Sequence, residues 1–367
     1  MQRHEMVVIG AGPAGLSASI EAAKSGVEVV VFDENDRPGG QLFKQIHKFF
    51  GSKEHRAMGR GFSIGTDLLQ EAKSLGVEVV LNAVVLGIYE NEVMNVVLDS
   101  RVEVVKGQRI LVATGASENM IPFLGWTLPG VIGAGAAQTM TNIHGVRPGE
   151  KLLMVGSGNV GLVVSYQMLQ AGCEVVAVID AARRIGGYGV HAAKIARQGV
   201  PFYLSHTVKE AHGRDRVEGA TIIQVDERWK PVPGTEKRFD VDTICIAVGL
   251  SPMTKLLGMS GCEMMYVPAL GGTVPVHDVN QKTSVSSIYV AGDVSGIEEA
   301  STAIIEGRIA GLAIAHSLGY MDDAAFSGQR DQQLCSMAGL RSGPHGDARR
   351  EAKELINAAV QGQSHAR

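Results

Sequence analysis

The chain opens with a pattern of apolar and polar positions that predicts a strand, a helix and a second strand. A β-branched run at residues 7–9 is followed by helical spacing over residues 16–24 and a second apolar run over residues 27–32. Short apolar runs bounded by turn residues are typical of buried strands, and longer stretches with a 3.6-residue period are typical of helices. Gly26 ends the helical stretch, and Asp33 follows the second run. The pattern therefore predicts a βαβ unit that ends in an acidic residue.

The turn between the first strand and the helix has the glycine spacing of a dinucleotide-binding loop. Gly10 allows a sharp turn, Gly12 has no side chain to keep a pyrophosphate away, and Gly15 lets the helix pack closely on the sheet. The helix N-terminus offers unpaired N–H groups and a positive dipole end to phosphates. Asp33 is placed to accept hydrogen bonds from an adenosine ribose. A purely structural glycine turn is the alternative interpretation.

The same pattern recurs from residue 151. An apolar run leads into Gly156, Gly158 and Gly161, and a helical stretch and a strand ending at Asp180 follow. Self-similarity of this kind indicates a repeated structural unit. The chain is therefore predicted to be an α/β protein with two Rossmann-like folds.

Further apolar runs extend both folds, and the chain changes character after Tyr320. Strands or hairpins are expected at residues 77–85, 93–106, 109–113, 199–203, 216–238, 242–248 and 287–291, and helices at residues 64–74 and 299–317. The segment after Tyr320 is polar and is expected to be a tail, not a domain. Its charged helical patch carries apolar residues at spacings of three and four: Ala352, Leu355, Ile356 and Ala359. This narrow face is expected to dock on a partner, with packing on its own domain as the alternative.

Composition and charge exclude several classes of function. The net charge is −4 and the basic residues form no long cluster, which argues against nucleic acid as the main partner. No stretch of uncharged apolar residues is long enough to span a membrane, and the first strand begins too early for a signal peptide. Cys173, Cys245, Cys262 and Cys335 show no CxxC spacing. They fit reduced thiols in the cytoplasm, with no metal or iron–sulfur site in this chain.

The order of the glycine motifs resembles the flavoproteins with two dinucleotide-binding domains. The first glycine loop is followed by Thr114-Gly115, then by the second glycine loop, and last by an apolar strand that ends in Gly292-Asp293. The match covers about residues 5–320. The resemblance implies an FAD-binding domain at residues 1–118 and 250–320, a nucleotide-binding domain of the NAD(P) type inserted at residues 119–249, and a tail at residues 321–367.

The resemblance also implies roles for residues near the end of the FAD-binding domain. Asp293 would bind the ribityl chain or lie by the pyrophosphate, and the helix that starts near Ala300-Ser301 would point its N–H groups at the N1–C2=O edge of the flavin. A reduced flavin develops negative charge near N1, which a helix N-terminus stabilises. The expected cofactor-binding residues are Gly10, Gly12, Pro13, Ala14, Gly15, Asp33, Glu34, Gly40, Gln41, Val84, Thr114, Gly115, Gly156, Gly158, Asn159, Val160, Gly161, Asp180, Gly292, Asp293, Ala300 and Ser301.

Missing cysteines narrow the family further. Residues 37–60 and 116–150, where disulfide reductases of this fold carry their paired cysteines, contain none, so dithiol chemistry is excluded. The segments at residues 37–41, 125–130 and 134–138 resemble the FAD-containing α subunits of bacterial amino-acid and amine dehydrogenase complexes. Those families include hydrogen cyanide synthase, opine oxidase and sarcosine oxidase. Several such subunits end in a cysteine-rich iron–sulfur segment, whereas this tail has one cysteine, so a cluster would be absent or on another subunit.

The nucleotide preference of the second fold rests on its acidic residue. Asp180 repels a 2′-phosphate and suits a free ribose diol, which favours NAD over NADP. However, it lies one residue later relative to Gly172 than Asp33 does relative to Gly26, and such a slip could turn its side chain to the other face. Residues 183–184 are arginines that either meet a 2′-phosphate or are solvated. NADP or another adenine nucleotide is therefore the alternative to NAD.

These features indicate an oxidoreductase that passes hydride or electrons between a nicotinamide nucleotide, FAD and a partner subunit or electron carrier. The expected setting is a dehydrogenase complex acting on an amine or hydroxy acid, in which a dehydrogenase or ferredoxin-like subunit is the partner of this chain. Hydride transfer from nicotinamide to flavin needs positioning and no side-chain base, so no catalytic residue is assigned. The alternatives are a free-standing NADH:acceptor reductase of the ferredoxin type and a non-catalytic subunit that holds FAD for assembly.

Overall fold

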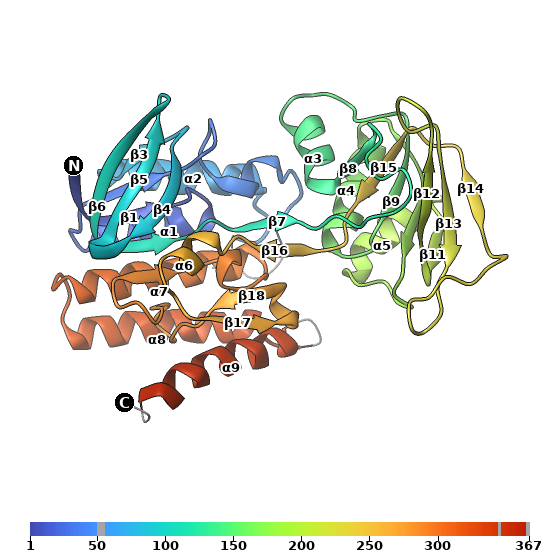
Figure 1. Cartoon of the computed structure of the whole chain (residues 1–367). Helices are drawn as coiled ribbons and strands as arrows, with labels where there is room; N and C mark the ends of the chain where they lie inside the picture. The colour runs from blue at the N-terminus through green and yellow to red at the C-terminus, as the bar shows by residue number, and fades with distance from the viewer. Residues whose placement is uncertain (50–55, 344–345, 365–367) are drawn as a thin grey trace. The chain divides into compact units, whose positions relative to one another are not determined.

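The computed structural model describes residues 1–49, 56–343 and 346–364. The chain forms two compact units: unit 1 comprises Met1–Ser117 and Ser251–Arg367, and unit 2 comprises Glu118–Leu250. Each unit is built on a Rossmann-like sheet with parallel strands and helices packed on it (Figure 1), so the predicted fold class is confirmed. The strands that connect the two units, β7 (Ala116–Glu118) and β16 (Leu250–Pro252), pair with each other.

The sheet of unit 1 has seven strands. Their order is β3-β2-β1-β6-β5-β4, and β19 pairs with β6. Strands β1, β2, β3, β6 and β19 pair in parallel, whereas β5 pairs antiparallel with β4 and β6. The strands are β1 (Gln2–Ile9), β2 (Val29–Phe32), β3 (Glu78–Val80), β4 (Val84–Tyr89), β5 (Val93–Leu98), β6 (Arg101–Val112) and β19 (Ile288–Val290).

Alternation along β1 divides the core of unit 1 between the two faces of the sheet. Met6 and Val8 pack with the helices α1 (Pro13–Lys24), α2 (Gly61–Ser74) and α7 (Ala300–Ser317). Val7 and Ile9 pack on the other face with β4, β5 and the short helix α6 (Lys255–Met259). Successive side chains of a strand point to opposite faces, so one apolar run supplies two cores.

Helices α1 and α7 lie so close together that their backbones touch. A Cβ atom on Gly307 would collide with the carbonyl oxygen of Ala14, and one on Gly311 would collide with that of Ala18. Glycine at these two positions of α7 therefore allows an approach that any side chain would prevent. The approach fixes where the N-terminus of α7 lies relative to the first glycine loop.

The segment after Tyr320 forms two helices that pack on unit 1. Helix α8 (Asp323–Leu340) buries Met337 against α7, and helix α9 (Asp347–Ser364) buries Ala352 and Ile356 against the hairpin of β17 (Met264–Val267) and β18 (Gly272–Pro275). The apolar face expected to dock on a partner therefore covers part of its own unit. Of the four apolar residues that the spacing puts on one face of α9, Ala352 and Ile356 are buried but Leu355 is 56% exposed, and their contact depends on a hairpin distant in sequence.

Unit 2 repeats the architecture with five parallel strands in the order β11-β10-β9-β15-β8. Helices cover one face, and a three-stranded antiparallel sheet packs on the other. Its strands are β8 (Val131–Gly133), β9 (Lys151–Val155), β10 (Glu174–Asp180), β11 (Phe202–Leu204), β12 (His206–His212), β13 (Gly219–Gln224), β14 (Lys237–Phe239) and β15 (Thr243–Ile246). Its helices are α3 (Ala134–Asn142), α4 (Asn159–Gln170) and α5 (Gly189–Ala196). Short 3₁₀ helices lie in unit 1 at η1 (Gly40–Lys44), η2 (Glu90–Glu92), η3 (Pro268–Leu270) and η4 (Asp293–Ser295).

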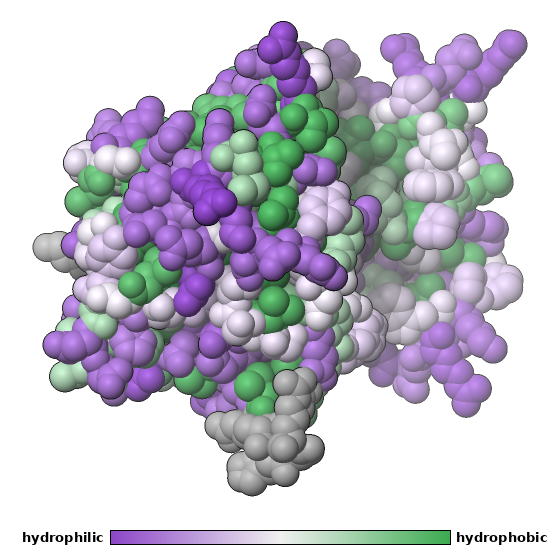
Figure 2. Space-filling view, turned by 60° about the vertical axis from the view of Figure 1, so that its left-hand side comes forward, coloured by the Kyte–Doolittle hydropathy of each residue, from purple (hydrophilic) through white to green (hydrophobic). Residues whose placement is uncertain are grey.

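The surface mixes polar and apolar side chains. Figure 2 shows purple hydrophilic residues on the face turned toward the viewer, with smaller green hydrophobic groups between them. Leu86 on β4 and Val102 on β6 are among the exposed apolar residues of unit 1. Within the part of the chain that the structure describes, no helix is long and apolar enough to cross a membrane.

The close approach of α1 and α7 predicts opposite effects of two glycine substitutions. Gly311→Ala would place a methyl group against the backbone of α1 and should lower the free energy of unfolding by about 1–3 kcal/mol. The control is Gly328→Ala in α8, where a Cβ meets nothing within 4 Å. It should be neutral or stabilise the protein by up to about 1 kcal/mol, because alanine favours the helix. Urea unfolding followed by circular dichroism measures both, and equal effects would contradict the close approach.

Candidate dinucleotide sites

The first glycine loop lies where the parallel strands of unit 1 end. Ile9 pairs with Phe32 and Val112, which brings the next residues of the three strands together. Gly10 has a φ of +108°, and a Cβ on it would collide with the carbonyl oxygen of Ala113. In contrast, a Cβ on Gly12 would meet no described protein atom within 4 Å. The loop therefore leaves open space at one glycine and is tightly packed at the other.

The remaining residues of the first loop form the start of α1. A Cβ on Gly15 would collide with the carbonyl oxygen of Gly10, so the helix can begin this close to the turn only with glycine there. Pro13 occupies the first helical position, where its missing N–H costs no hydrogen bond, and Ala14 is buried. The N-cap residue of α1, Gly12, has no side chain that could cap the helix. The N–H groups of the first turn can therefore face an anion.

The second glycine loop repeats this geometry in unit 2. Gly156 has a φ of +110°, and its Cβ would collide with the carbonyl oxygen of Ala247, while Gly161 packs on Gly156 as Gly15 packs on Gly10. A Cβ on Gly158 would meet no described atom within 4 Å. Helix α4 begins at Asn159, its N-cap residue Gly158 has no side chain that could cap it, and Val160 is exposed. Both units therefore contain an open space at the N-terminus of a helix, beside Gly12 in unit 1 and beside Gly158 in unit 2. We call each of these spaces a cradle.

The two acidic residues bind their glycine loops in the same way. The Oδ2 atom of Asp33 accepts a hydrogen bond from the N–H of Ala11 at 2.6 Å, and the Oδ2 atom of Asp180 accepts one from the N–H of Ser157 at 2.7 Å. Ala11 and Ser157 occupy equivalent positions between the first two glycines of their loops. Asp180 also accepts a hydrogen bond from the Ser157 hydroxyl at 2.6 Å.

A β-bulge explains why the extra residue before Asp180 does not turn it away. The register between β9 and β10 shifts between Val175 and Ala177 and is regular again up to the pair Val155–Ile179. A bulge absorbs one residue and restores the alternation of faces beyond it. Asp180 therefore faces its glycine loop as Asp33 does, which removes the doubt raised by its sequence position.

A loop with two glycines packs on each cradle, and only the first of these loops was predicted from the sequence. The N–H of Gly39 donates to the carbonyl of Ala11 at 2.7 Å, and a Cβ on Gly40 would lie 3.0 Å from the Cα atom of Gly12. In unit 2, the N–H of Gly187 donates to the carbonyl of Ser157 at 2.9 Å. The missed signal is a repeat: Arg-Pro-Gly-Gly-Gln at residues 37–41 corresponds to Arg-Ile-Gly-Gly-Tyr at residues 184–188.

Other expected cofactor residues of unit 1 lie around the same end of the sheet. Val84 is 39% exposed, and its neighbour Ala83 donates its N–H to the carbonyl of Asp33 at 2.9 Å. Glu34 and Gln41 are exposed. Gly115 has a φ of +72° and open space at its Cβ position. The hydroxyl of Thr114 already donates to the carbonyl of Met253 at 2.9 Å.

The segment from Gly292 to α7 meets the first glycine loop from the other side. A Cβ on Gly292, which has a φ of +80°, would lie 2.9 Å from the Cβ atom of Ala14. Burial is the main reason that the pKa of Asp293 is raised, to about 6; the hydrogen bond from the Glu298 N–H opposes the rise, and the nearby carboxylates of Glu306, Glu298 and Glu299 add to it. Helix α7 begins at Ala300, the side chain of its N-cap residue Glu299 makes no capping hydrogen bond, and Ser301 is buried. The structure thus brings Gly292 and the start of α1 together.

The counterpart of α7 in unit 2 has a carboxylate at its N-terminus. Strand β8 pairs with β15 as β19 pairs with β6, and α3 follows β8 as α7 follows β19. The Oε1 atom of Glu118 accepts a hydrogen bond from the N–H of Gly135, in the first turn of α3, at 2.5 Å. The two cradles are therefore alike in their glycine loops and differ at the N-terminus of the helix beside them, which is α7 in unit 1 and α3 in unit 2.

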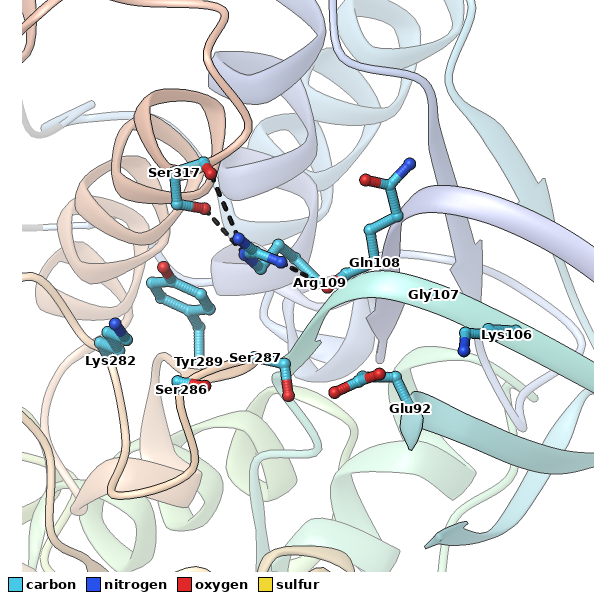
Figure 3. A pocket seen from close by; sticks show the side chains of 10 residues that line it. All are labelled: Glu92, Lys106, Gly107, Gln108, Arg109, Lys282, Ser286, Ser287, Tyr289 and Ser317. Atoms are coloured by element: carbon cyan, nitrogen blue, oxygen red, sulfur yellow. Dashed lines mark hydrogen bonds between the residues drawn. The ribbon is translucent and has the colours of Figure 1, made fainter. Parts of the chain in front are cut away.

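A cavity of about 390 Å³ lies in unit 1, and its lining includes none of the cofactor-binding residues expected from the sequence (Figure 3). It is lined by residues 106–109, which precede the part of β6 that leads to Ala113. The guanidinium of Arg109 donates to the hydroxyl of Ser317 at 3.0 Å and to its carbonyl at 3.2 Å. Arg109 therefore binds the last turn of α7 and takes no part in the nucleotide sites.

Other reactive groups are few in the described part of the chain. The four cysteines are free, and Cys173, Cys245 and Cys262 are buried. No group of three or more His, Cys, Asp and Glu side chains among the described residues could hold a metal ion. Burial lowers the pKa of His191, with help from the charge of Lys194.

Two Rossmann-like folds with matching glycine loops and acids define a class of α/β proteins that bind two dinucleotides. The chain belongs to the pyridine nucleotide-disulphide oxidoreductase family, whose profile matches residues 4–307. Members of this family typically bind FAD and NAD(P). The resemblance found in the sequence is thereby confirmed.

Three curated relatives are named as components of larger enzymes. The chain is 31% identical to an opine oxidase subunit from Rhizobium meliloti (strain 1021), over 87% of its own length and 72% of that protein. It is 28% identical to the HcnB subunit of hydrogen cyanide synthase from Pseudomonas aeruginosa, over 91% of its length and 76% of that protein. It is 25% identical to the alpha subunit of sarcosine oxidase from Corynebacterium sp. (strain P-1), of which it spans 33%.

Among solved structures, T. acidophilum thioredoxin reductase has a similar fold. The TM-score is 0.72 at 21% identity, and the alignment covers 87% of this chain and 99% of that one. L-proline dehydrogenase from P. horikoshii matches with a TM-score of 0.68 at 21% identity, over 90% of this chain and 59% of that one. At these identities the comparison establishes the fold.

The raised pKa of Asp293 predicts how its substitution changes the stability of protein freed of bound nucleotide. A carboxyl with a higher pKa in the folded state binds its proton more tightly there, so ionisation destabilises the fold as pH rises from about 4 through about 6. Asp293→Asn should therefore stabilise the nucleotide-free protein at pH 7.5 by no more than about 3 kcal/mol, and the gain should vanish near pH 4. Thermal unfolding across this pH range measures the effect.

The control for this prediction is the exposed Asp36→Asn, whose side chain is 74% exposed. It should leave the pH dependence of unfolding as in the wild type. An Asp293→Asn gain that persists at pH 4 would mean that the carboxyl is not a buried acid in the folded protein.

Proposed function

We propose that this protein is an FAD-dependent oxidoreductase subunit that holds FAD in unit 1 and a nicotinamide nucleotide in unit 2. Hydride or electrons would pass between the nicotinamide nucleotide, FAD and a partner subunit or electron carrier. The observation that carries the proposal is the pair of open cradles at Gly12 and Gly158, each at a helix N-terminus and beside an acid that binds the glycine loop. Neighbouring glycines whose Cβ atoms would collide with backbone make this open space a specific feature of each loop.

In unit 1 the groups around the first loop fit FAD. The N–H groups at the start of α1 would bind the pyrophosphate, and Asp33 would accept hydrogen bonds from the adenosine ribose. Asp293, next to Gly292, would bind the ribityl chain or the pyrophosphate. The N-terminus of α7 would stabilise negative charge on a reduced ring. FAD, when bound, supplies the group that accepts and returns two electrons.

In unit 2 the same elements fit NAD. Asp180 would bind the ribose diol and repel a 2′-phosphate. Asn159 and Val160, at the start of α4, would lie by the pyrophosphate. Arg183 forms an exposed ion pair with Glu227 at 2.5 Å, which is consistent with a solvated charge. NADP or another adenine nucleotide is the second candidate for this site.

The partner is proposed to be a dehydrogenase subunit that acts on an amine or hydroxy acid, in a cytoplasmic complex. Three relatives are named as subunits, and the free cysteines offer no internal acceptor of the dithiol type. Because the apolar face of α9 packs on unit 1, a partner would use other surfaces. Native mass measurement of the protein from its source tests this, and a chain associated only with itself would contradict it.

Glycine substitutions at the two cradles test the cofactor assignment. Gly12→Val and Gly158→Val both add a side chain in open space, so both proteins should fold. Gly12→Val should purify with at least about tenfold less flavin, because its side chain occupies the position of the pyrophosphate. Gly158→Val should keep its flavin and lose its reduction by NADH.

The measurements are flavin absorbance and its anaerobic bleaching by NADH, with each variant serving as the control of the other. A full flavin content in Gly12→Val would refute the assignment of FAD to unit 1. Bleaching of the lone wild-type chain followed by electron transfer to ferredoxin would favour the NADH:acceptor reductase. Bound flavin that NADH never bleaches would favour the assembly role.

Asp180→Asn tests the nucleotide preference. The amide keeps an oxygen to accept hydrogen bonds from Ser157 and removes the charge that repels a 2′-phosphate. The ratio of kcat/KM for NADH to that for NADPH in flavin reduction should fall about tenfold or more. The control is Asp226→Asn, in an exposed turn of unit 2. An unchanged ratio in Asp180→Asn would show that another group selects the nucleotide.

A further inference from the structure

Four charged side chains form a buried cluster next to residues 292–298, the segment that leads to α7. Glu298, Glu306, Arg341 and Lys353 have side-chain exposures of 5, 2, 14 and 4%. Charged residues are seldom buried this deeply unless they are paired, because leaving water costs several kcal/mol per ion. None of these residues belongs to the glycine loops, and they are distinct from the two acids that bind those loops, Asp33 and Asp180.

Glu306 joins this cluster to the Gly292–Ser295 turn. One carboxylate oxygen, Oε2, accepts hydrogen bonds from the N–H of Gly292 and the hydroxyl of Ser295, both at 2.9 Å. The other, Oε1, accepts from Arg341 at 2.6 Å and from Lys353 at 2.8 Å. A side chain of α7 thus fixes the turn that precedes its own helix.

The two cations come from the last two helices and bind the same segment. Lys353, on α9, also donates to the carbonyl of Ser295 at 3.0 Å and to its hydroxyl at 2.7 Å. Arg341, directly after α8, makes a two-pronged pair with Glu298 at 2.9 and 2.6 Å. Residues 292–298 are therefore held by Glu306 and by the two cations, Arg341 and Lys353.

The charge state of Glu306 depends on these cations. Burial raises the pKa of its carboxyl, but Lys353 and Arg341 lower it more, to about 2. An ionised carboxylate accepts stronger hydrogen bonds from N–H and O–H donors than a protonated one. The pairing therefore strengthens the bonds that hold the N–H of Gly292 and the hydroxyl of Ser295.

We propose that Lys353 and Arg341 are positioning residues for the flavin: through Glu306 and Ser295 they hold the Gly292–Asp293 turn and the start of α7 in place to receive it. The inference rests on the binding of FAD in unit 1 proposed above. The competing view is that the cluster only fastens α8 and α9 to the unit. The two views differ in what happens to the flavin when a cation is removed.

Lys353→Met is the direct test, because methionine keeps most of the length of the unbranched side chain and removes the charge. FAD should bind about tenfold or more weakly, and the midpoint potential of the bound flavin should become more negative. The substitution would displace the N-terminus of α7 and leave the negative charge of Glu306 without Lys353. Both effects disfavour the reduced anionic ring. Lys353→Arg should restore much of both properties.

The matched control is Arg350→Met on the same helix, where the side chain is 45% exposed and pairs only at the surface, with Asp347 and Glu354. It should leave flavin affinity and potential unchanged. If Lys353→Met lowers the unfolding temperature but keeps the wild-type affinity and potential, the cluster only fastens the helices and the inference is wrong.

Ser295→Ala keeps the inference testable if Lys353→Met does not fold. It removes the hydroxyl shared by Glu306 and Lys353 without leaving a charge unpaired. Weaker flavin binding in a folded Ser295→Ala protein supports the inference, and wild-type binding overturns it. A wild-type protein that takes up no FAD would instead refute the proposed function itself, so the two failures are distinguishable.

Discussion

The backbone contact between α1 and α7 is the constraint on which the candidate FAD site depends. Gly307 and Gly311 face the carbonyls of Ala14 and Ala18, and Gly292 faces the side chain of Ala14. Residues some 300 positions apart in the chain are thereby brought into contact. A single methyl group at these glycines would separate the two helix N-termini that are proposed to bind the pyrophosphate and the ring of one FAD. Small residues are required here by geometry, and the favourable burial of apolar area alone would not select them.

The buried ion pairs extend this constraint to the last two helices. Packed methyl groups would stabilise α8 and α9 as well as an ion network does, and without the cost of desolvating charges. Hydrogen bonds to charged groups are more directional, however, and here they end on one N–H and one hydroxyl of a single turn. The network is therefore better suited to fixing the position of that turn than to adding stability.

Much of the fold was predictable from the sequence because the glycine loops and the apolar runs are local patterns. Gly10 and Gly156 need a positive φ, and the strands around them alternate or are continuously apolar, so both signals lie within a few residues. The direction in which the Asp180 side chain points was not predictable from the sequence. It depends on a bulge at residues 175–177 that absorbs one residue, and such a bulge has no distinctive sequence. Lys353 and Arg341 were also missed. Lys353 lies in a charged helical stretch and Arg341 directly after a polar helix, so both look like solvated residues, and their burial depends on contacts with Glu306 and Glu298.

The two units differ in the helix beside each cradle, and this difference bears on the proposed placement of FAD in unit 1. Both units have the same glycine loop, acid and loop with two glycines, so both would suit an adenosine pyrophosphate. In unit 1 the side chain of Glu299, the N-cap residue of α7, makes no capping hydrogen bond. In unit 2 the carboxylate of Glu118 already bonds the first turn of α3, where a ligand with developing negative charge would be repelled. The group at this one helix terminus would therefore disfavour an electron-rich ring in unit 2, which supports the proposed placement of the flavin in unit 1.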